Sequence, residues 1–173
     1  IVFDSAPDFE SGRSNAYAVT VNVTDGDNTD SEAITINVTN ENDIAPAFTS
    51  ANAFSVAEGG TAVATLTGTD DDGSTPTFST VLTGPDAADF DLTAGGVLTF
   101  KATTDFEDPA DNGTNNVYNI FATITDGTNT STQAITITVT DTNDNSPVLS
   151  VSTPYSVAEG TTAVGTVTAA DAD

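Results

Sequence analysis

Asp141-Thr142-Asn143-Asp144-Asn145-Ser146-Pro147 concentrates carboxylates and side-chain amides within five residues and closes on a proline. A second stretch with the same plan, Asn40-Glu41-Asn42-Asp43-Ile44-Ala45-Pro46, lies 101 residues upstream. Carboxylate, amide and main-chain carbonyl oxygens are the ligands that Ca²⁺ takes, roughly six to eight at a time. We therefore interpret the two stretches as calcium-binding joints between repeated β-modules.

The rest of the chain repeats with the same period of 101 residues. Residues 47–72 align with residues 148–173 without a gap and share the sequence Ser-Val-Ala-Glu-Gly. Residues 1–43 align with residues 98–144 once a four-residue insertion is allowed. Such internal repetition predicts an array of like modules. We expect three parts: the C-terminal part of one repeat (1–43), a complete repeat (44–145) and the N-terminal part of the next (146–173).

The segments of each repeat have the pattern of half-buried β-strands. Apolar residues alternate with Thr, Asn and Ala along residues 17–24, 34–39, 118–124 and 135–139, and a period of two is typical of a strand with one buried face. The complete repeat is expected to hold seven strands, near 47–57 (broken), 62–69, 77–82, 88–93, 96–101, 117–125 and 131–140. Seven short antiparallel strands in about 100 residues indicate an all-β, immunoglobulin-like Greek-key sandwich. The chain is therefore predicted to contain one whole sandwich and two partial ones.

The composition restricts the chemistry available to the chain. It has 26 acidic residues against two basic ones, Arg13 and Lys101, and a formal net charge of −24. Nucleic acids and anionic membrane surfaces need Lys and Arg, so both are poor partners. Cys and His are absent, which excludes disulfides, zinc, haem and iron–sulfur ligation, and nucleophiles activated by histidine. Hard oxygen ligands remain, and these suit Ca²⁺ or Mg²⁺.

The sequence also carries expectations about where the chain belongs. No apolar run reaches the ~20 residues of a membrane span, so we expect the chain not to be membrane-spanning itself. It begins in the middle of a strand pattern at Ile1, as a piece of a longer secreted protein would. We expect it to be extracellular or at a cell surface.

Acidic residues cluster at the predicted strand ends, where loops collect at the two poles of a sandwich. The groups that we expect to meet are Glu58, the pair Asp105 and Glu107, the linker 141–145 and, from the next repeat, the pair Asp171 and Asp173. Residues two apart on an extended segment point to one side, so each pair offers two carboxylates together. A diffuse acidic surface is the alternative, and it is the interpretation we give to the remaining acids, such as Asp27, Asp30, Glu32 and Asp91.

These motifs resemble the calcium-binding motifs of cadherin repeats, in the form seen in large bacterial surface adhesins. The matches are Glu58 and Glu159 for the lone glutamate, Asp8-Phe9-Glu10 and Asp105-Phe106-Glu107 for Asp-x-Glu, Asp25 and Asp126 for the aspartate after the sixth strand, and Asp70-Asp71-Asp72 and Asp171-Ala172-Asp173 for Asp-x-Asp. The linker 141–147 matches the family motif completely. The resemblance covers the whole chain, and the motifs recur in the same order at the same period.

The resemblance implies several Ca²⁺ ions at two joints. The expected ligands of the first joint are Asp8, Glu10, Asn40, Asn42, Asp43, Ile44, Asp70, Asp72 and Asp126. Those of the second joint are Glu58, Asp105, Glu107, Asp141, Thr142, Asn143, Asp144, Asn145, Asp171 and Asp173. Asn40 stands where the family has an aspartate and brings no charge, whereas the Ile44 position acts through its main-chain carbonyl. The first joint is therefore predicted to bind Ca²⁺ more weakly or to hold fewer ions.

The function that the resemblance implies is a calcium-rigidified rod segment of an adhesin. Its partners would be calcium, other copies or repeats of the same long chain, and another cell-surface molecule. A structural subunit or slice of an extracellular filament or surface layer is the alternative. A carbohydrate-binding module would want an aromatic platform, but the chain has no Trp and only three Tyr. Carboxylate pairs also serve glycoside hydrolysis, but the pairs here fall at module junctions, so we expect no enzyme activity.

Overall fold

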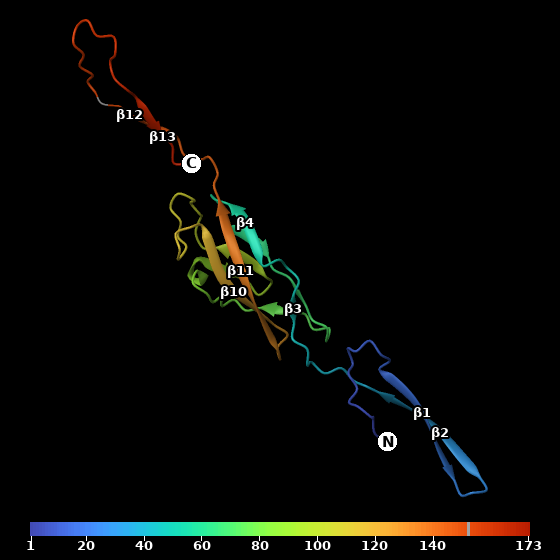
Figure 1. Ribbon diagram of the computed structural model, residues 1–173. Coiled ribbons are helices and arrows are strands. Elements are labelled where there is room, and N and C mark those ends of the chain that lie inside the picture. Colours follow the sequence, from blue (N-terminus) through green and yellow to red (C-terminus); the bar gives the residue numbers. More distant parts are fainter. Residues whose placement is uncertain (152) are drawn as a thin grey trace.

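The computed structural model describes residues 1–151 and 153–173 and is almost entirely β-structure. The chain forms an elongated molecule, with an N-terminal hairpin, a central sandwich and a C-terminal pair of strands following one another along its length (Figure 1). Among the described residues, no helix combines the length and the apolar character needed to cross a membrane.

Two facing sheets make up the central sandwich. The first has the order β4 (Ala53–Ala57), β11 (Thr130–Thr140), β10 (Val117–Thr125) and β7 (Thr77–Phe78). The second has the order β5 (Ala62–Thr65), β9 (Val97–Phe100) and β8 (Phe90–Leu92), and the short 3-10 helix η1 (Ala87–Asp89) leads into it. A further short pair joins β3 (Ala47–Phe48) to β6 (Gly68–Thr69). All seven expected strands have a counterpart, and the first is broken, into β3 and β4, as predicted.

One part of the strand prediction is wrong. The seven strands were expected to be antiparallel, but β4 runs parallel to β11, with Phe54 opposite Ile137 and Val56 opposite Val139. The break explains this arrangement, because it moves the first strand from an antiparallel pairing with β6 to the edge of the other sheet. A parallel pair needs a long connection, and almost the whole module lies between β4 and β11 in the sequence.

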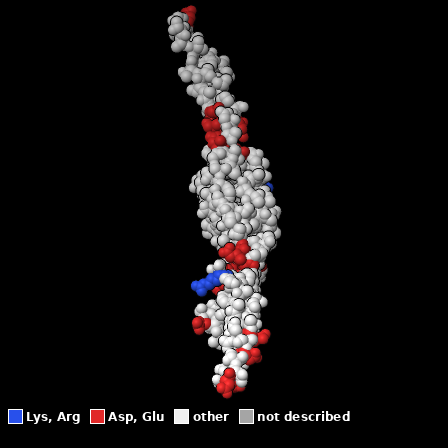
Figure 2. All heavy atoms as spheres, turned by 90° about the vertical axis from the view of Figure 1, so that its right-hand side faces the viewer, with Lys and Arg blue, Asp and Glu red and all other residues white. Residues whose placement is uncertain are grey.

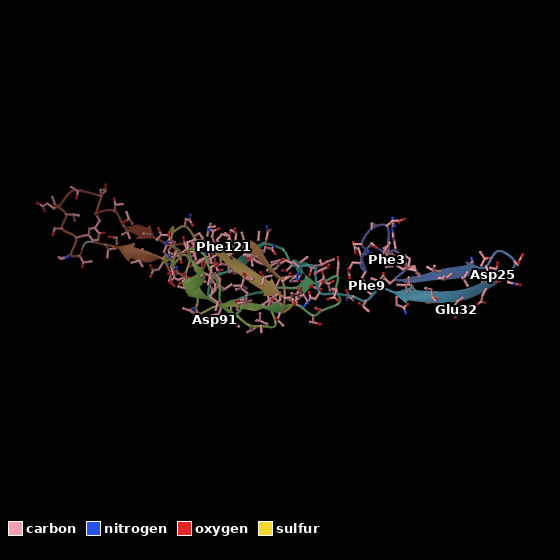
Figure 3. The ribbon with its side chains drawn as sticks, turned by 90° about the horizontal axis from the view of Figure 1, so that it is seen from below. Phe3, Phe9, Asp25, Glu32, Asp91 and Phe121 are labelled. Atoms are coloured by element: carbon pink, nitrogen blue, oxygen red, sulfur yellow. The ribbon has the colours of Figure 1, made fainter. Side chains whose placement is uncertain are left out.

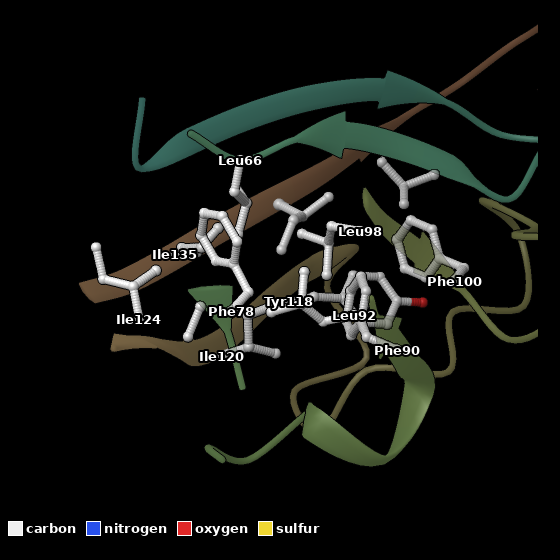
Figure 4. Close-up of a cluster of buried hydrophobic side chains, with 13 residues drawn as sticks. Leu66, Phe78, Phe90, Leu92, Leu98, Phe100, Tyr118, Ile120, Ile124 and Ile135 are labelled. Atoms are coloured by element: carbon white, nitrogen blue, oxygen red, sulfur yellow. The ribbon is translucent and has the colours of Figure 1, made fainter. Parts of the chain in front are cut away.

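The hydrophobic core lies between the two sheets of the central sandwich (Figure 4). Its buried members are Leu66, Phe78, Phe90, Leu92, Leu98, Phe100, Tyr118, Ile120, Ala122, Ile124, Ile135, Ile137 and Val139. Alternate residues of β10 and β11 point inward, as the sequence pattern predicts. At one end of the core, the rings of Phe90 and Phe100 have centroids 4.4 Å apart, and each meets Tyr118 edge-on.

The flanking pieces are thinner. The hairpin β1 (Ala16–Thr24) and β2 (Thr29–Asn37) pairs over nine residues, from Ala16 opposite Asn37 to Thr24 opposite Thr29. Beyond the sandwich, β12 (Val148–Ser150) pairs with β13 (Thr168–Ala170). In the part of the chain that the structure describes, no second sheet packs on the hairpin, and Val23 is 65% exposed.

Candidate metal centres

Acidic side chains gather in two bands, one at each end of the central sandwich (Figure 2). We call them the first joint, around the linker 40–46, and the second joint, around the linker 141–147. Each band collects residues that lie far apart in the sequence. The fold therefore concentrates like charge at the two positions where one module meets the next.

Two overlapping groups of carboxylates form the first joint. Oxygens of Glu10, Asp43 and Asp72 lie within 4.8 Å of one another, and so do oxygens of Asp70, Asp72 and Asp126. Glu10 precedes β1, Asp43 belongs to the linker, and the other three belong to loops of the central sandwich. Asp72 is shared by both groups, so it lies at the centre of the joint.

Hydrogen bonds from the linker hold Asp72 in place. Its Oδ2 atom accepts a bond of 2.8 Å from the main-chain N–H of Ile44, and its carbonyl oxygen accepts one of 2.8 Å from Nδ2 of Asn40. Asp72 is only 9% exposed, and its Oδ1 atom is buried without a partner. Oδ2 of Asp70 and Oε1 of Glu10 are also buried without partners. A buried carboxylate oxygen with nothing to bind is costly, and a cation would remove that cost.

The pKa values of these groups reflect the crowding. Loss of solvent, followed by the charges of Asp72 and Asp43, raises the pKa of Glu10. Loss of solvent and the charges of Asp126 and Asp72 raise the pKa of Asp70. These carboxyls are therefore harder to ionise than ordinary ones when no cation is bound.

Asp126 behaves in the opposite way because its loop holds it as an anion. Its Oδ1 atom accepts main-chain bonds from Thr128 at 2.7 Å and Asn129 at 2.6 Å. Desolvation raises the pKa of Asp126, but these bonds outweigh it, and the pKa lies below its ordinary value. One oxygen of Asp126 nevertheless lies within 4.8 Å of oxygens of Asp70 and Asp72.

The second joint has the same kind of donors in a more open setting. Oxygens of Glu58, Asp105 and Glu107 lie within 4.8 Å of one another, and oxygens of Glu107, Asp141 and Asp173 form a second such group. All of these residues except Glu58 are exposed. Desolvation, followed by the charge of Glu58 and then those of neighbouring aspartates, raises the pKa of Glu107.

Hydrogen-bond donors, most of them in the linker, hold the carboxylates of Glu58 and Asp173 at the second joint. Glu58 accepts a bond of 2.8 Å from the N–H of Thr142 through Oε1, and a second bond from the N–H of Phe106 through Oε2. Asp173 accepts bonds from Asn145, 3.0 Å long from its main-chain nitrogen and 3.2 Å long from its side-chain nitrogen. The linker thus contacts the central sandwich on one side and the C-terminal piece on the other.

The remaining predicted ligands lie around these groups. Oδ1 of Asp8 accepts a bond of 3.0 Å from the N–H of Glu10, and Oδ1 of Asp105 accepts one of 3.1 Å from the N–H of Glu107, so the same turn recurs at both joints. The N–H of Asp144 contacts Asp173 at 3.4 Å. In the described part of the chain, Asp144 and Asp171 belong to neither acidic group of the second joint.

Asp25, the counterpart of Asp126, lies away from both joints. It is at the tip of the β1–β2 hairpin, at the far end from the central sandwich, whereas Phe9 lies at the near end (Figure 3). Its Oδ1 atom accepts main-chain bonds from Asp27 at 3.0 Å and Asn28 at 2.8 Å, as in the Asp126 loop. These bonds lower its pKa.

Two acids interpreted as solvated surface are in fact buried. Asp86 is 2% exposed and accepts main-chain bonds from Asn112 at 2.7 Å and Asn119 at 2.6 Å. Asp111 is 3% exposed and accepts bonds of 2.8 to 3.1 Å from N–H groups of the loop that follows it. Both anchor loops of the sandwich by satisfying backbone donors, a role that charge counting along the sequence does not reveal.

One residue of the first joint was missed by the sequence analysis. Nδ2 of Asn129 lies 3.3 Å from Oδ1 of Asn42, and 3.4 Å from the carbonyl oxygens of Asn42 and Ile44 and from Oδ2 of Asp126. The internal repeat could have drawn attention to Asn129, because Asn28 follows Asp25 at the same spacing as Asn129 follows Asp126.

No protein-family model matches the sequence, and no curated protein matches it. Solved structures do match. A structure of protocadherin gammaB7 EC3-6 shares 24% identity, covers 98% of this chain and 46% of its own, and superposes with a TM-score of 0.73. Protocadherin Gamma B2 extracellular cadherin domains 3-6 give 22% identity, 98% and 45% coverage and a TM-score of 0.72.

A third match is human CDH23 EC21-23, with 22% identity, 92% coverage of this chain, 55% coverage of its own and a TM-score of 0.64. The chain thus spans about half the length of each of these cadherin structures. Agreement over nearly its whole length includes the sandwich and both flanking pieces. The protein has the fold of tandem cadherin extracellular repeats.

Proposed function

We propose that the chain is a segment of an extracellular, cadherin-like rod of a surface adhesin, and that Ca²⁺ ions at its two joints make the rod stiff. The observation that carries the proposal is the state of Asp72. Its carboxylate is buried among other carboxylates, yet one oxygen has no partner. A like-charged, partly unpaired cluster is unfavourable unless a cation completes it.

The donor set of each joint fits Ca²⁺. At the first joint, the carboxylates of Glu10, Asp43, Asp70, Asp72 and Asp126 are joined by oxygens of the linker 40–46. At the second, those of Glu58, Asp105, Glu107, Asp141 and Asp173 are joined by oxygens of the linker 141–145. All donors are hard oxygens, and a mixture of carboxylate, amide and main-chain oxygens suits Ca²⁺ better than softer metals.

Stiffening follows from where the donors come from. Within one acidic group of the first joint, Glu10 precedes β1, Asp43 belongs to the linker and Asp72 belongs to the sandwich. Without a cation these charges repel one another. A bound ion removes the repulsion and joins all three segments, so its binding free energy becomes resistance to bending and unfolding.

The division into repeats supports the same proposal. We place the repeat boundaries at 43/44 and 145/146, which leaves the core residues inside the central unit of 44–145. Each linker then contributes acids to the joint beside it. Other copies or repeats of the same long chain, and another cell-surface molecule, are the partners that we propose for such a rod.

The elongated, end-to-end arrangement favours a second candidate function as well (Figure 1). A filament or surface layer built from such repeats, on a bacterial or other cell, would need the same stiff joints. Binding of a soluble or cell-bound partner by the isolated chain would favour the adhesin. Assembly of the chain with itself into fibres in Ca²⁺ would favour the filament.

Small-angle X-ray scattering of the chain in Ca²⁺ and in excess chelator tests the proposal. We expect a rod-like profile in Ca²⁺ and a profile of a jointed, more variable particle in chelator. Asp91→Asn removes an exposed charge on β8 and serves as the control, which should respond to Ca²⁺ as the wild-type chain does. Identical profiles with and without Ca²⁺ would rule out calcium-dependent stiffness.

A further inference from the structure

The amide nitrogen of Asn129 is surrounded by oxygens. Four of them, from Asn42, Ile44 and Asp126, lie at 3.3 to 3.4 Å from Nδ2. An amide nitrogen carries two hydrogens, so at most two of the four oxygens can receive a well-directed bond. All four distances exceed the usual N–H···O distance of about 2.9–3.0 Å, so each contact is weak.

The four oxygens are of the kinds that Ca²⁺ takes. They comprise one carboxylate, one side-chain amide and two main-chain carbonyl oxygens. Asp126 is also one of the acids that meet Asp72, whose buried Oδ1 atom has no partner. The amide of Asn129 therefore donates to oxygens on the rim of the acidic group.

The loop fixes the amide in this place. The carbonyl oxygen of Asn129 accepts a side-chain bond of 2.8 Å from Thr125 and a main-chain bond of 3.3 Å from Asp126. Its main-chain nitrogen donates to Oδ1 of Asp126 at 2.6 Å. The side chain of Asn129 therefore takes no part in these loop bonds, and its nitrogen contacts oxygens of the linker.

We propose that Asn129 is a latch that holds the linker oxygens of the first joint to Asp126 until Ca²⁺ displaces its amide. This inference rests on the proposed function, because it takes the first joint to be a calcium site. In the absence of metal, the side-chain N–H groups of Asn129 form weak hydrogen bonds with these oxygens. The same hydrogen bonds must break when the ion takes the oxygens, so Asn129 lowers the calcium affinity of the first joint.

The earlier repeat supplies a matched control. Asn28 follows Asp25 as Asn129 follows Asp126, and Thr24 donates a side-chain bond of 2.8 Å to the carbonyl oxygen of Asn28. Asn28 lies in an exposed loop at the far tip of the hairpin. Asn28→Ala therefore repeats the chemical change in an equivalent loop away from both joints.

Nuclear magnetic resonance of the full chain during a CaCl₂ titration tests the latch. The amide of Ile44 reports the first joint, and the amide of Asn145 reports the second. We expect Asn129→Ala to lower the Ca²⁺ concentration at the midpoint for Ile44 by about two- to tenfold, as the loss of one or two weak hydrogen bonds implies. The midpoint for Asn145 should not move, and Asn28→Ala should move neither.

A second variant guards against an effect of truncation on the loop. Asn129→Leu keeps about the size of the side chain, removes the donor and adds no charge, so it should also lower the Ile44 midpoint. An unchanged or higher Ile44 midpoint in both Asn129 variants would overturn the latch while leaving calcium binding intact. Absence of any saturable response of Ile44 and Asn145 in the wild-type chain would instead overturn the proposed function.

Discussion

The first joint is partly buried and tied to the central sandwich, whereas the second is exposed. Asp72 and Asp126 of the first joint are shielded and hydrogen-bonded to linker or loop, but Asp105, Glu107, Asp141 and Asp173 of the second are open to solvent. The linker sequences, by contrast, predict that the second joint binds Ca²⁺ more strongly than the first. The linker 141–147 matches the calcium motif completely, and the linker 40–46 departs from it at Asn40 and Ile44.

Within this sequence, loops of the central sandwich supply the enclosure of the first joint. The loops 70–73 and 126–129 of the central sandwich close over the first joint. At the second joint, the C-terminal piece contributes Asp173, and the position equivalent to Asp126 would fall 101 residues further on, outside the 173 residues of the sequence. Enclosure strengthens electrostatic interactions because water screens buried charges less. The following changes separate the effect of enclosure from the effect of linker sequence.

Removal of Ca²⁺ should have the largest effect. Ligands bound only by the folded state stabilise it by about 2.7 kcal/mol per site at a hundredfold excess over Kd. With several sites, chelation should lower the melting temperature on the order of 10 °C or more, as measured by calorimetry. Mg²⁺ at equal ionic strength is the control, and equal melting temperatures in Ca²⁺ and chelator would contradict this expectation.

Asp72→Asn should weaken calcium binding at the first joint by at least about tenfold, because Asp72 belongs to both acidic groups there. In chelator the same change should raise the melting temperature, because it removes a buried charge from a like-charged cluster. The exposed Asp173→Asn should weaken only the second joint. Calcium titration followed at Ile44 and Asn145 measures the affinity of each joint separately. Equal losses of affinity, from Asp72→Asn at the first joint and from Asp173→Asn at the second, would show that enclosure has no influence.

Acidification should affect stability with opposite signs in chelator and in Ca²⁺. Glu10, Asp70, Glu107 and Asp144 have raised pKa values, so the folded, metal-free chain binds protons more readily than the unfolded chain. Metal-free stability should therefore increase as the pH falls from 7 to about 5, above the ordinary carboxyl range. Only below that range do the lowered pKa values of Asp25 and Asp126 oppose the gain.

In Ca²⁺ the same protonation competes with metal, so stability should decrease over that pH window. Urea unfolding at several pH values in chelator and in Ca²⁺ measures both trends. A metal-free chain that loses stability between pH 7 and 5 would contradict the crowding of these carboxyls.

Asn40→Asp should have the smallest effect. It gives the first linker the aspartate that the second linker has at Asp141, and the added charge favours Ca²⁺. However, the side-chain amide of Asn40 donates a hydrogen bond of 2.8 Å to the carbonyl oxygen of Asp72, and an aspartate cannot donate this bond. We expect calcium affinity at Ile44 to increase only about two- to fivefold, since a charge and a hydrogen bond are exchanged. An increase above about a hundredfold would show that the linker sequence controls the first joint.

Much of the fold follows from local pattern. The alternation along β10 and β11 predicted which residues face inward, and Ile120, Ile124 and Ile137 are buried. The same alternation predicted strands in the regions of β1 and β2. Ile124 is fully buried while Val23, its counterpart, is 65% exposed. Among the described residues, a second sheet covers β10 but not β1, as expected if residues 1–43 are only part of a repeat.

The candidate site divides in the same way. The acidic motifs and their period identified Glu58, Asp72 and Asp126 as residues that should meet at joints. The sequence did not indicate that Asp86 and Asp111 anchor loops by accepting main-chain bonds, since a carboxylate looks the same in either role. The sequence did not indicate Asn129, because an asparagine of an ordinary turn cannot be told by residue type from one that contacts a linker.

By itself, the sequence determined the repeat, the strand pattern, the extreme negative charge and the restriction to oxygen ligands. These properties depend on residue type and on spacing along the chain. Only the tertiary structure decided the parallel position of β4, the burial of Asp72 at the first joint, and the unpaired oxygen of Asp72. These depend on which distant segments exclude water from one another, and a linear pattern does not record such contacts.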